Sequence, residues 1–166
     1  MRLFLIIIVL FCSILIGIKI KNYFIKREKF FLEVVKLAEI ISNEISYRSE
    51  KLILIIEKCF NNFDSSLNAC LATFRDYLKN IISKQELKNK IKKELNFLND
   101  DEVNLFFNFL FSLGEQTKEE EIINILNYKK RICNFYDDAK IKNNKYSNLY
   151  LKLFIVLGLT IGILFL

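Results

Sequence analysis

Apolar residues fill both ends of the chain, and mixed apolar and polar residues fill the stretch between them. Positions 3–18 carry no charge, and a second apolar run at 149–166 has Lys152 as its single charge. A helix rises about 1.5 Å per residue and needs roughly 17–25 residues to cross the core of a bilayer. The pattern therefore predicts transmembrane helices at residues 1–20 and 149–166, with a separate domain at 21–148 between them.

The first apolar run is interpreted as an uncleaved anchor. Arg2 is the single basic residue ahead of it, and no small-residue cleavage motif of a signal peptide follows it. A lipoprotein would use Cys12, but Phe11 is too large for the position before a lipidated cysteine. Both ends of the domain are therefore expected to be held in the membrane.

Amphipathic spacing predicts helices throughout the middle of the chain. Apolar residues at intervals of three and four mark one helical face at Phe31, Val34, Ala38, Ile41 and Ile45. A very apolar helix is expected after Ser49, and further inward faces are expected at Leu67, Leu71, Phe74, Leu78 and Ile81, at Leu87, Ile91, Leu95 and Leu98, and at Ile122, Leu126, Ile132, Cys133 and Tyr136. Strand-like alternation is missing. The expected fold is all-α, a helical bundle flanked by an N-terminal and a C-terminal transmembrane helix.

Capping signals divide the middle into helices. Ser83 with Glu86, and Asn99 with Glu102, have the spacing of a capping box, in which each side chain bonds a free backbone N–H at a helix start. The helix after Asn99 is expected at the centre of the bundle, because it carries four phenylalanines, although a membrane-facing surface is the alternative use for them. These residues are Phe106, Phe107, Phe109 and Phe111.

The stretch LGEQTKEEE predicts a tight corner between two helices. Gly114 stands where a helix must stop, and glycine enters the left-handed conformation there without steric cost. Thr117 and Glu120 then form a capping box for a helix starting at Lys118. That helix has no clear break before the second membrane span, and the pair Asn143–Asn144 is the place where it would loosen.

The basic residues cluster beside the two spans. The net charge of +6 comes mostly from these clusters, and the positive-inside rule places the domain between them in the cytoplasm. Nucleic-acid binding, the other reading of the charge, is disfavoured because no basic face continues through the domain. Contact with anionic lipid headgroups is expected for Lys19, Lys21, Lys26, Arg27, Lys140, Lys142 and Lys145.

The sequence shows no recognisable catalytic constellation, and its acidic pairs are interpreted as solvated or helix-capping residues. The chain has no histidine, its four cysteines form no C-x-x-C pair, and its four glycines form no phosphate-binding loop. We therefore expect no enzyme activity, cofactor or metal. Gly158 and Gly162 form a small-xxx-small pattern, which lets two membrane helices approach closely.

Three motifs give the chain a family resemblance. A basic stretch after the first span leads into Glu44-Ile45-Ser46-Tyr47, followed by Lys51-Leu52. The corner reads Leu113-Gly114-x-x-Thr117-x-x-x-Glu121, and a long helix then enters a span containing Gly158 and Gly162. With its layout, the chain resembles the stage III sporulation protein AB family. That family usually has Pro-Leu where Lys51-Leu52 stands, and it typically reads LG-x-x-D-x-x-x-Q at the corner.

The resemblance implies a place in the complex built across the two membranes between mother cell and forespore. The family is similar to the cytoplasmic domain of the type II secretion platform protein F, which implies a non-enzymatic scaffold in the mother-cell membrane around the forespore. Its expected partners are the other proteins of that complex, including its ATPase, and membrane lipids. Candidate docking residues are Glu44, Tyr47, Glu115 and Thr117, within a motif that also includes Leu113, Gly114 and Glu121.

Two alternatives remain at this point. The corner residues have a purely structural interpretation, in which Gly114 and Thr117 only shape the turn. The whole chain has another functional interpretation, as a membrane-anchored helical tether or assembly factor of the cell envelope unrelated to sporulation.

Overall fold

The chain is folded into helices in the computed structural model. The structure describes residues 2–48, 51–114 and 117–164, with no strand among them. The all-α prediction is therefore confirmed. The residues group into two compact units, a helix-pair unit of Met1–Glu28 with Asp137–Leu166 and a bundle unit of Lys29–Tyr136. Residues 21–28 and 137–148, which the hydropathy pattern assigns to the central domain, thus group with the two apolar ends.

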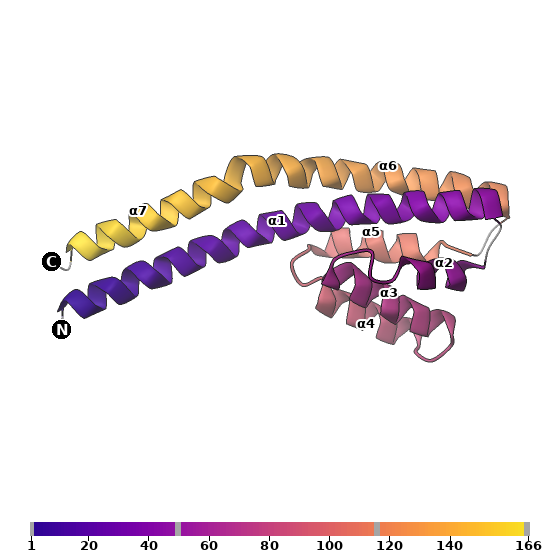
Figure 1. The fold of residues 1–166 in the computed structure, drawn as a ribbon, viewed down its shortest axis with the longest axis horizontal. Helices are drawn as coiled ribbons and strands as arrows, with labels where there is room; N and C mark the ends of the chain where they lie inside the picture. The colour runs from indigo at the N-terminus through magenta and orange to yellow at the C-terminus, as the bar shows by residue number, and fades with distance from the viewer. Residues whose placement is uncertain (1, 49–50, 115–116, 165–166) are drawn as a thin grey trace. The chain divides into compact units, whose positions relative to one another are not determined.

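The bundle unit is organised around a single central helix. Its elements are the later part of α1 (Arg2–Arg48), then α2 (Leu52–Cys59), α3 (Ser65–Leu78), α4 (Lys84–Glu94), α5 (Asp100–Phe111) and the earlier part of α6 (Lys118–Lys142). Within this unit, α1 lies between α5 and α6 (Figure 1). Phe30 of α1 meets Phe106 of α5 edge-on, with ring centroids 5.3 Å apart. Phe31 stacks on Phe135 of α6 at 5.7 Å.

The apolar face predicted for this part of α1 is confirmed. All five of its residues are buried, from Phe31 to Ile45. Phe30 and Leu37 are buried as well, which widens the apolar face beyond the predicted stripe. The wider face follows from the position of α1, because a helix packed on two sides must be apolar on both.

The phenylalanines of α5 belong to the core of the bundle unit. Phe106, Phe107 and Phe109 are buried, and Phe111 is half-buried with the Lys84 ammonium 4.0 Å from its ring centroid. These contacts support the core interpretation over a membrane-facing surface.

Two residues predicted to face inward are exposed instead. Ile81 is 67% exposed, because α3 ends at Leu78 and the chain then turns through Asn80 with a positive φ of 59°. On α6, Leu126 is 50% exposed and its neighbour Ile125 is fully buried. Neighbouring positions on a helix point about 100° apart, so the face of α6 was predicted one residue out of phase at this point.

Two of the three predicted capping boxes are complete. At α4, the Ser83 N–H donates to Glu86 Oε2 at 2.9 Å and the Glu86 N–H donates to Ser83 Oγ at 3.2 Å. At α5, the Asn99 N–H donates to Glu102 Oε2 at 3.1 Å, and the Glu102 N–H donates to Asn99 Oδ1 at 2.8 Å. Each box satisfies two backbone donors that a helix start leaves free.

The helix-pair unit contains the beginning of α1 and the end of the chain. Its second helical segment comprises the end of α6, a π-helical segment η1 (Asn143–Ser147) and α7 (Asn148–Leu164). The π-helical segment occurs at the asparagine pair where loosening was expected. There Asn143 Nδ2 donates to Glu28 Oε2 at 2.6 Å, which ties the segment to α1.

Within the described part of the chain, two helices are long and apolar enough to cross a membrane. The qualifying stretches lie within Ile6–Tyr47 and Lys118–Leu164, by length and composition. The prediction of an apolar helix near each end of the chain is thus confirmed.

Candidate functional site: the α5–α6 corner and the end of α1

Gly114 makes the corner after α5. Its φ is +84°, in the left-handed region that the sequence predicted for it, and the preceding Leu113 is buried. The Gly114 N–H donates to Glu121 Oε1 at 2.8 Å. Glu121 is itself buried, with a relative exposure of 8%. A carboxylate seven residues further along the chain therefore holds the turn closed.

Thr117 starts the helix that follows. The Glu121 N–H donates to the Thr117 carbonyl at 2.8 Å, which is the first bond of the helical ladder. Glu120 Oε2 accepts both the Thr117 N–H, at 3.3 Å, and the Thr117 hydroxyl, at 2.8 Å. The half of the predicted capping box in which Glu120 reaches back to Thr117 is thus present. Glu115 lies outside the described residues.

The motif at the corner consequently has a structural explanation. Leu113 is buried, Gly114 supplies the backbone conformation, and Glu121 closes the turn. Thr117 is exposed, but its polar groups are used by Glu120. A glutamine has an amide oxygen at the same reach as the Glu121 carboxylate, so either residue type can accept the Gly114 N–H.

The end of α1 presents a different picture. Tyr47 is 87% exposed, so its ring is almost entirely in solvent. Glu44 is half-buried, with Oε2 3.9 Å from Lys58 Nζ. The Glu44 charge also contributes, after burial, to raising the pKa of the Cys59 thiol. Of the two α1 candidates, Glu44 is thus engaged with α2 and Tyr47 is available to a partner.

A shallow hollow of about 280 Å³ lies between α1 and α6 in the same unit. Lys129 Nζ and Glu39 Oε1 form an ion pair of 2.8 Å along it. Residues lining it are Ala38, Glu39, Ser42, Asn43, Ile125, Leu126 and Lys129. Sequence reasoning did not select any of these as candidate docking residues, because their exposure depends on where α1 and α6 meet.

Exposed side chains, most of them apolar, lie on α1 and α6 in the same unit as this hollow. Ile40, Asn43 and Tyr47 follow each other at intervals of three and four, on one face of α1. Ile123 and Leu126 are three apart on α6, with exposures of 59% and 50%. We call these five residues the α1–α6 surface. It combines an exposed tyrosine with three exposed aliphatic side chains, the kind of composition found at the centre of protein interfaces.

The basic residues of the helix-pair unit do not all face solvent. Arg27 is 5% exposed, and its Nη2 lies 2.9 Å from Asp138 Oδ2. This burial contradicts the predicted contact between Arg27 and lipid headgroups. Lys142 also bonds Asp138, at 3.0 Å. These contacts, led by the Arg27 hydrogen bond, lower the pKa of Asp138. The remaining candidates that the structure leaves exposed are Lys19, Lys26, Lys140, Lys142 and Lys145, and Lys21 is half-buried.

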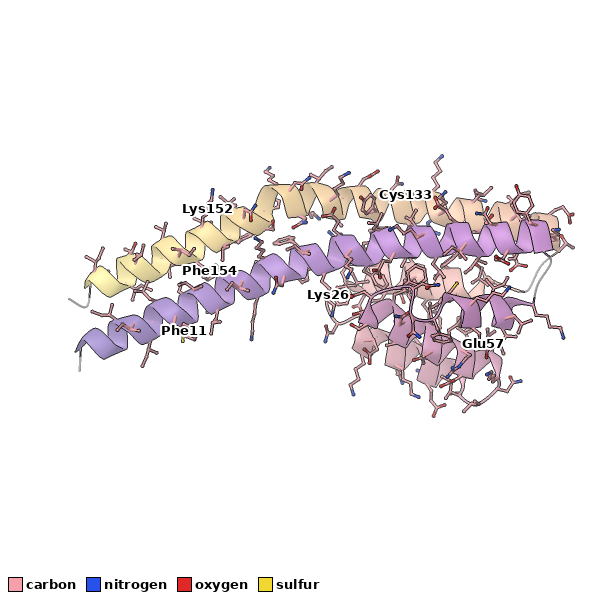
Figure 2. The ribbon with its side chains drawn as sticks, in the orientation of Figure 1. Phe11, Lys26, Glu57, Cys133, Lys152 and Phe154 are labelled. Atoms are coloured by element: carbon pink, nitrogen blue, oxygen red, sulfur yellow. The ribbon has the colours of Figure 1, made fainter. Side chains whose placement is uncertain are left out.

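Gly158 and Gly162 face α1. A Cβ added to Gly158 would lie 2.9 Å from Ser13 Cβ, and one added to Gly162 would lie 3.1 Å from Ile6 Cγ2. The Ser13 hydroxyl donates to the Phe154 carbonyl, and Phe154 lies between the helices, whereas Lys152 points away from α1 (Figure 2). The two helices of this unit are therefore in contact through small residues, which lets their backbones come close.

Comparison with known proteins identifies the family. A family model described as stage III sporulation protein AB matches residues 2–166. The chain belongs to the stage III sporulation protein AB family. No curated protein and no solved structure matches it. Membership implies a role in sporulation, and together with the two candidate spans it fits a membrane protein.

Proposed function

We propose that the protein is a non-enzymatic membrane scaffold of the secretion-like complex between mother cell and forespore. Its bundle unit faces the mother-cell cytoplasm and docks the ATPase of that complex. Family membership supports the setting, and the basic residues flanking both apolar ends support the orientation through the positive-inside rule. The envelope tether unrelated to sporulation is set aside, because the family model covers the chain.

The observation that carries the docking role is the α1–α6 surface. Tyr47 stands in the family motif and yet is 87% exposed, so its ring contributes little to the packing of the bundle unit. The motif residues at the corner, in contrast, are used to build the turn. A partner that covers Tyr47 and Leu126 would remove apolar surface from water, and aromatic residues at such centres carry much of the binding energy.

The setting is tested by the position of a fluorescent fusion in cells induced to sporulate, with growing cells as the control. Signal confined to the membrane around the engulfed forespore, together with loss of heat-resistant spores on deletion, supports the proposal. A uniform envelope signal during growth would contradict it.

The docking role is tested by substituting Tyr47. Tyr47→Ala should lower the yield of heat-resistant spores and the amount of ATPase co-purified with the protein, whereas Tyr47→Phe keeps the ring and should preserve both. Because Tyr47 is exposed, neither change should alter folding, which circular dichroism of the purified protein can check. Normal spore yield and ATPase recovery in Tyr47→Ala would exclude the α1–α6 surface as the docking site.

A further inference from the structure

A hollow that we call the mouth lies in the helix-pair unit, where the first apolar stretch of α1 gives way to lysines. This hollow of about 540 Å³ is lined by Lys19, Ile20, Tyr23 and Phe24 of α1 and by Tyr150 of α7. Phe24 and Tyr150 stack, with ring centroids 6.0 Å apart and planes 9° apart. The mouth thus joins one cationic side chain to an aromatic floor, the combination typical of the level of lipid headgroups.

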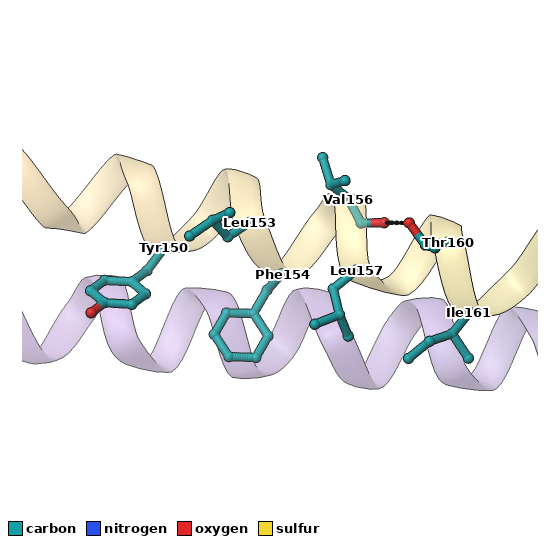
Figure 3. Close-up of a pocket in the computed structure, with 7 residues that line it drawn as sticks. All are labelled: Tyr150, Leu153, Phe154, Val156, Leu157, Thr160 and Ile161. Carbon is teal, nitrogen blue, oxygen red and sulfur yellow. Dashed lines mark hydrogen bonds between the residues drawn. The ribbon is translucent and has the colours of Figure 1, made fainter.

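An apolar groove continues along α7 from this mouth. It has a volume of about 560 Å³ and is lined by Tyr150, Leu153, Phe154, Val156, Leu157, Thr160 and Ile161, shown in Figure 3. Thr160 is the one residue beyond Tyr150 in this lining with a polar side chain, and its hydroxyl donates to the Val156 carbonyl at 2.9 Å. Beyond Tyr150 the groove therefore offers a hydrocarbon surface, because the Thr160 hydroxyl is already hydrogen-bonded within α7.

The two hollows share Tyr150, which therefore borders a charged end and an apolar end. From Tyr150 to Ile161 the helix rises about 16 Å, at about 1.5 Å per residue. One leaflet of a bilayer contributes half of a hydrocarbon core about 30 Å thick. The apolar part is thus about as long as one acyl chain.

The charge at the mouth lacks a protein counter-charge nearby in the sequence. Residues 2–27 and 139–166 contain no aspartate or glutamate. The acidic groups that border these stretches are engaged, since Asp138 bonds Arg27 and Glu28 bonds Asn143. An anion from the membrane is the complementary group for Lys19.

We propose that this groove is a binding site for one anionic phospholipid. The Lys19 ammonium holds the phosphate, the Tyr23 and Tyr150 rings lie at the level of the glycerol, and an acyl chain follows α7 to Ile161. A second membrane helix would also cover the apolar part, but it would leave Lys19 without an anion. The inference rests on the membrane insertion in the proposed function, and goes beyond it by assigning a ligand.

The test uses the full-length protein in mild detergent, titrated with phosphatidylglycerol or with phosphatidylcholine of the same acyl chains. Native mass spectrometry counts the lipids that stay bound. The unaltered protein should retain one phosphatidylglycerol in preference to phosphatidylcholine. Lys19→Gln should weaken that binding about five-fold, the factor given by roughly 1 kcal/mol for one lysine near an anionic surface. Lys152→Gln is the matched control, because Lys152 is exposed in the same unit and lines neither hollow.

A second pair of variants tests the apolar part. Leu157 and Leu159 are 51% and 48% exposed, but only Leu157 lines the groove. Leu157→Trp should fill the groove and displace the bound lipid, whereas Leu159→Trp should leave binding unchanged. Equal retention of the two lipids by the unaltered protein, or equal effects within either pair of variants, would overturn the proposal.

Membrane fractionation separates this proposal from the one on which it rests. If the protein sediments with membranes after an alkaline wash but shows no lipid preference, only the proposed lipid site is overturned. A protein released from membranes by that wash would overturn both the proposed membrane scaffold and the lipid site.

Discussion

Replacing Gly114 isolates the energetic cost of the corner. A Cβ added at this position would lie 3.4 Å from Leu52 Cδ2, an ordinary van der Waals contact, so space for a methyl group is available. The φ of +84° is the obstacle, because a side chain in the left-handed region costs roughly 1–2 kcal/mol. Gly114→Ala should therefore destabilise the bundle unit by about that amount. Gly114→Val should cost more, since a β-branched residue is poorly accommodated there. Gly114→Asn should cost less, because asparagine tolerates this conformation.

Thiol labelling measures this effect within the bundle unit of the full-length protein. Cys59 and Cys70 are buried in that unit, whereas Cys12 is exposed and Cys133 is half-buried, so the latter two are replaced by serine. When opening is faster than labelling, the rate follows the population of the open state. A cost of 1–2 kcal/mol should then accelerate labelling about five- to thirty-fold in Gly114→Ala. An unchanged rate in both Gly114→Ala and Gly114→Val would refute the left-handed assignment.

Three further outcomes are expected. Glu121→Ala should destabilise the bundle unit by about 1 kcal/mol in the same assay, because the Gly114 N–H loses its acceptor, and Glu121→Gln should restore most of the loss. Asp138→Asn should lower the stability of the helix-pair unit by roughly 1 kcal/mol, a figure kept small because the carboxylate is 44% exposed. Since the pKa of Asp138 is lowered in the folded protein, its contribution to stability should be complete above the ordinary aspartate pKa of about 3.9. That contribution should disappear as the pH falls through the lower folded pKa. Denaturant titrations at several pH values measure this loss, and they would show none if the Arg27 pair were absent. Burial raises the pKa of Cys70 to about 12, so at pH 8 maleimide should modify it only after unfolding, and rapid modification of the native protein would contradict its burial.

Local features of this fold could be predicted from the sequence. A capping box is complete within four residues, so Ser83 with Glu86 and Asn99 with Glu102 identify their helix starts without any knowledge of the tertiary structure. Gly114 is likewise recognisable, because few other residues fit its conformation.

Features that depend on the meeting of distant segments could not be predicted in the same way. Ile125 and Leu126 are equally apolar, and only the contact with α1 decides which of them is buried. Arg27 looks like a membrane-flanking cation until Asp138, more than a hundred residues later, lies beside it. Glu121 reads as a charge at a helix start, yet its carboxylate serves the turn before the helix. In each case the same local sequence pattern fits more than one tertiary environment.

The π-helical segment has a consequence for tolerance to changes in chain length. Ala139 and Gly158 are both buried in the helix-pair unit and are 19 residues apart. That interval leaves them about 100° out of line on an uninterrupted α-helix, whereas an interval one residue shorter completes five turns and aligns them. The wider turn at Asn143–Ser147 absorbs the surplus residue. A chain from which one residue of this segment is deleted can therefore continue as a regular α-helix with both buried positions on the same side, while a chain that gains one must rotate Gly158 away from Ser13.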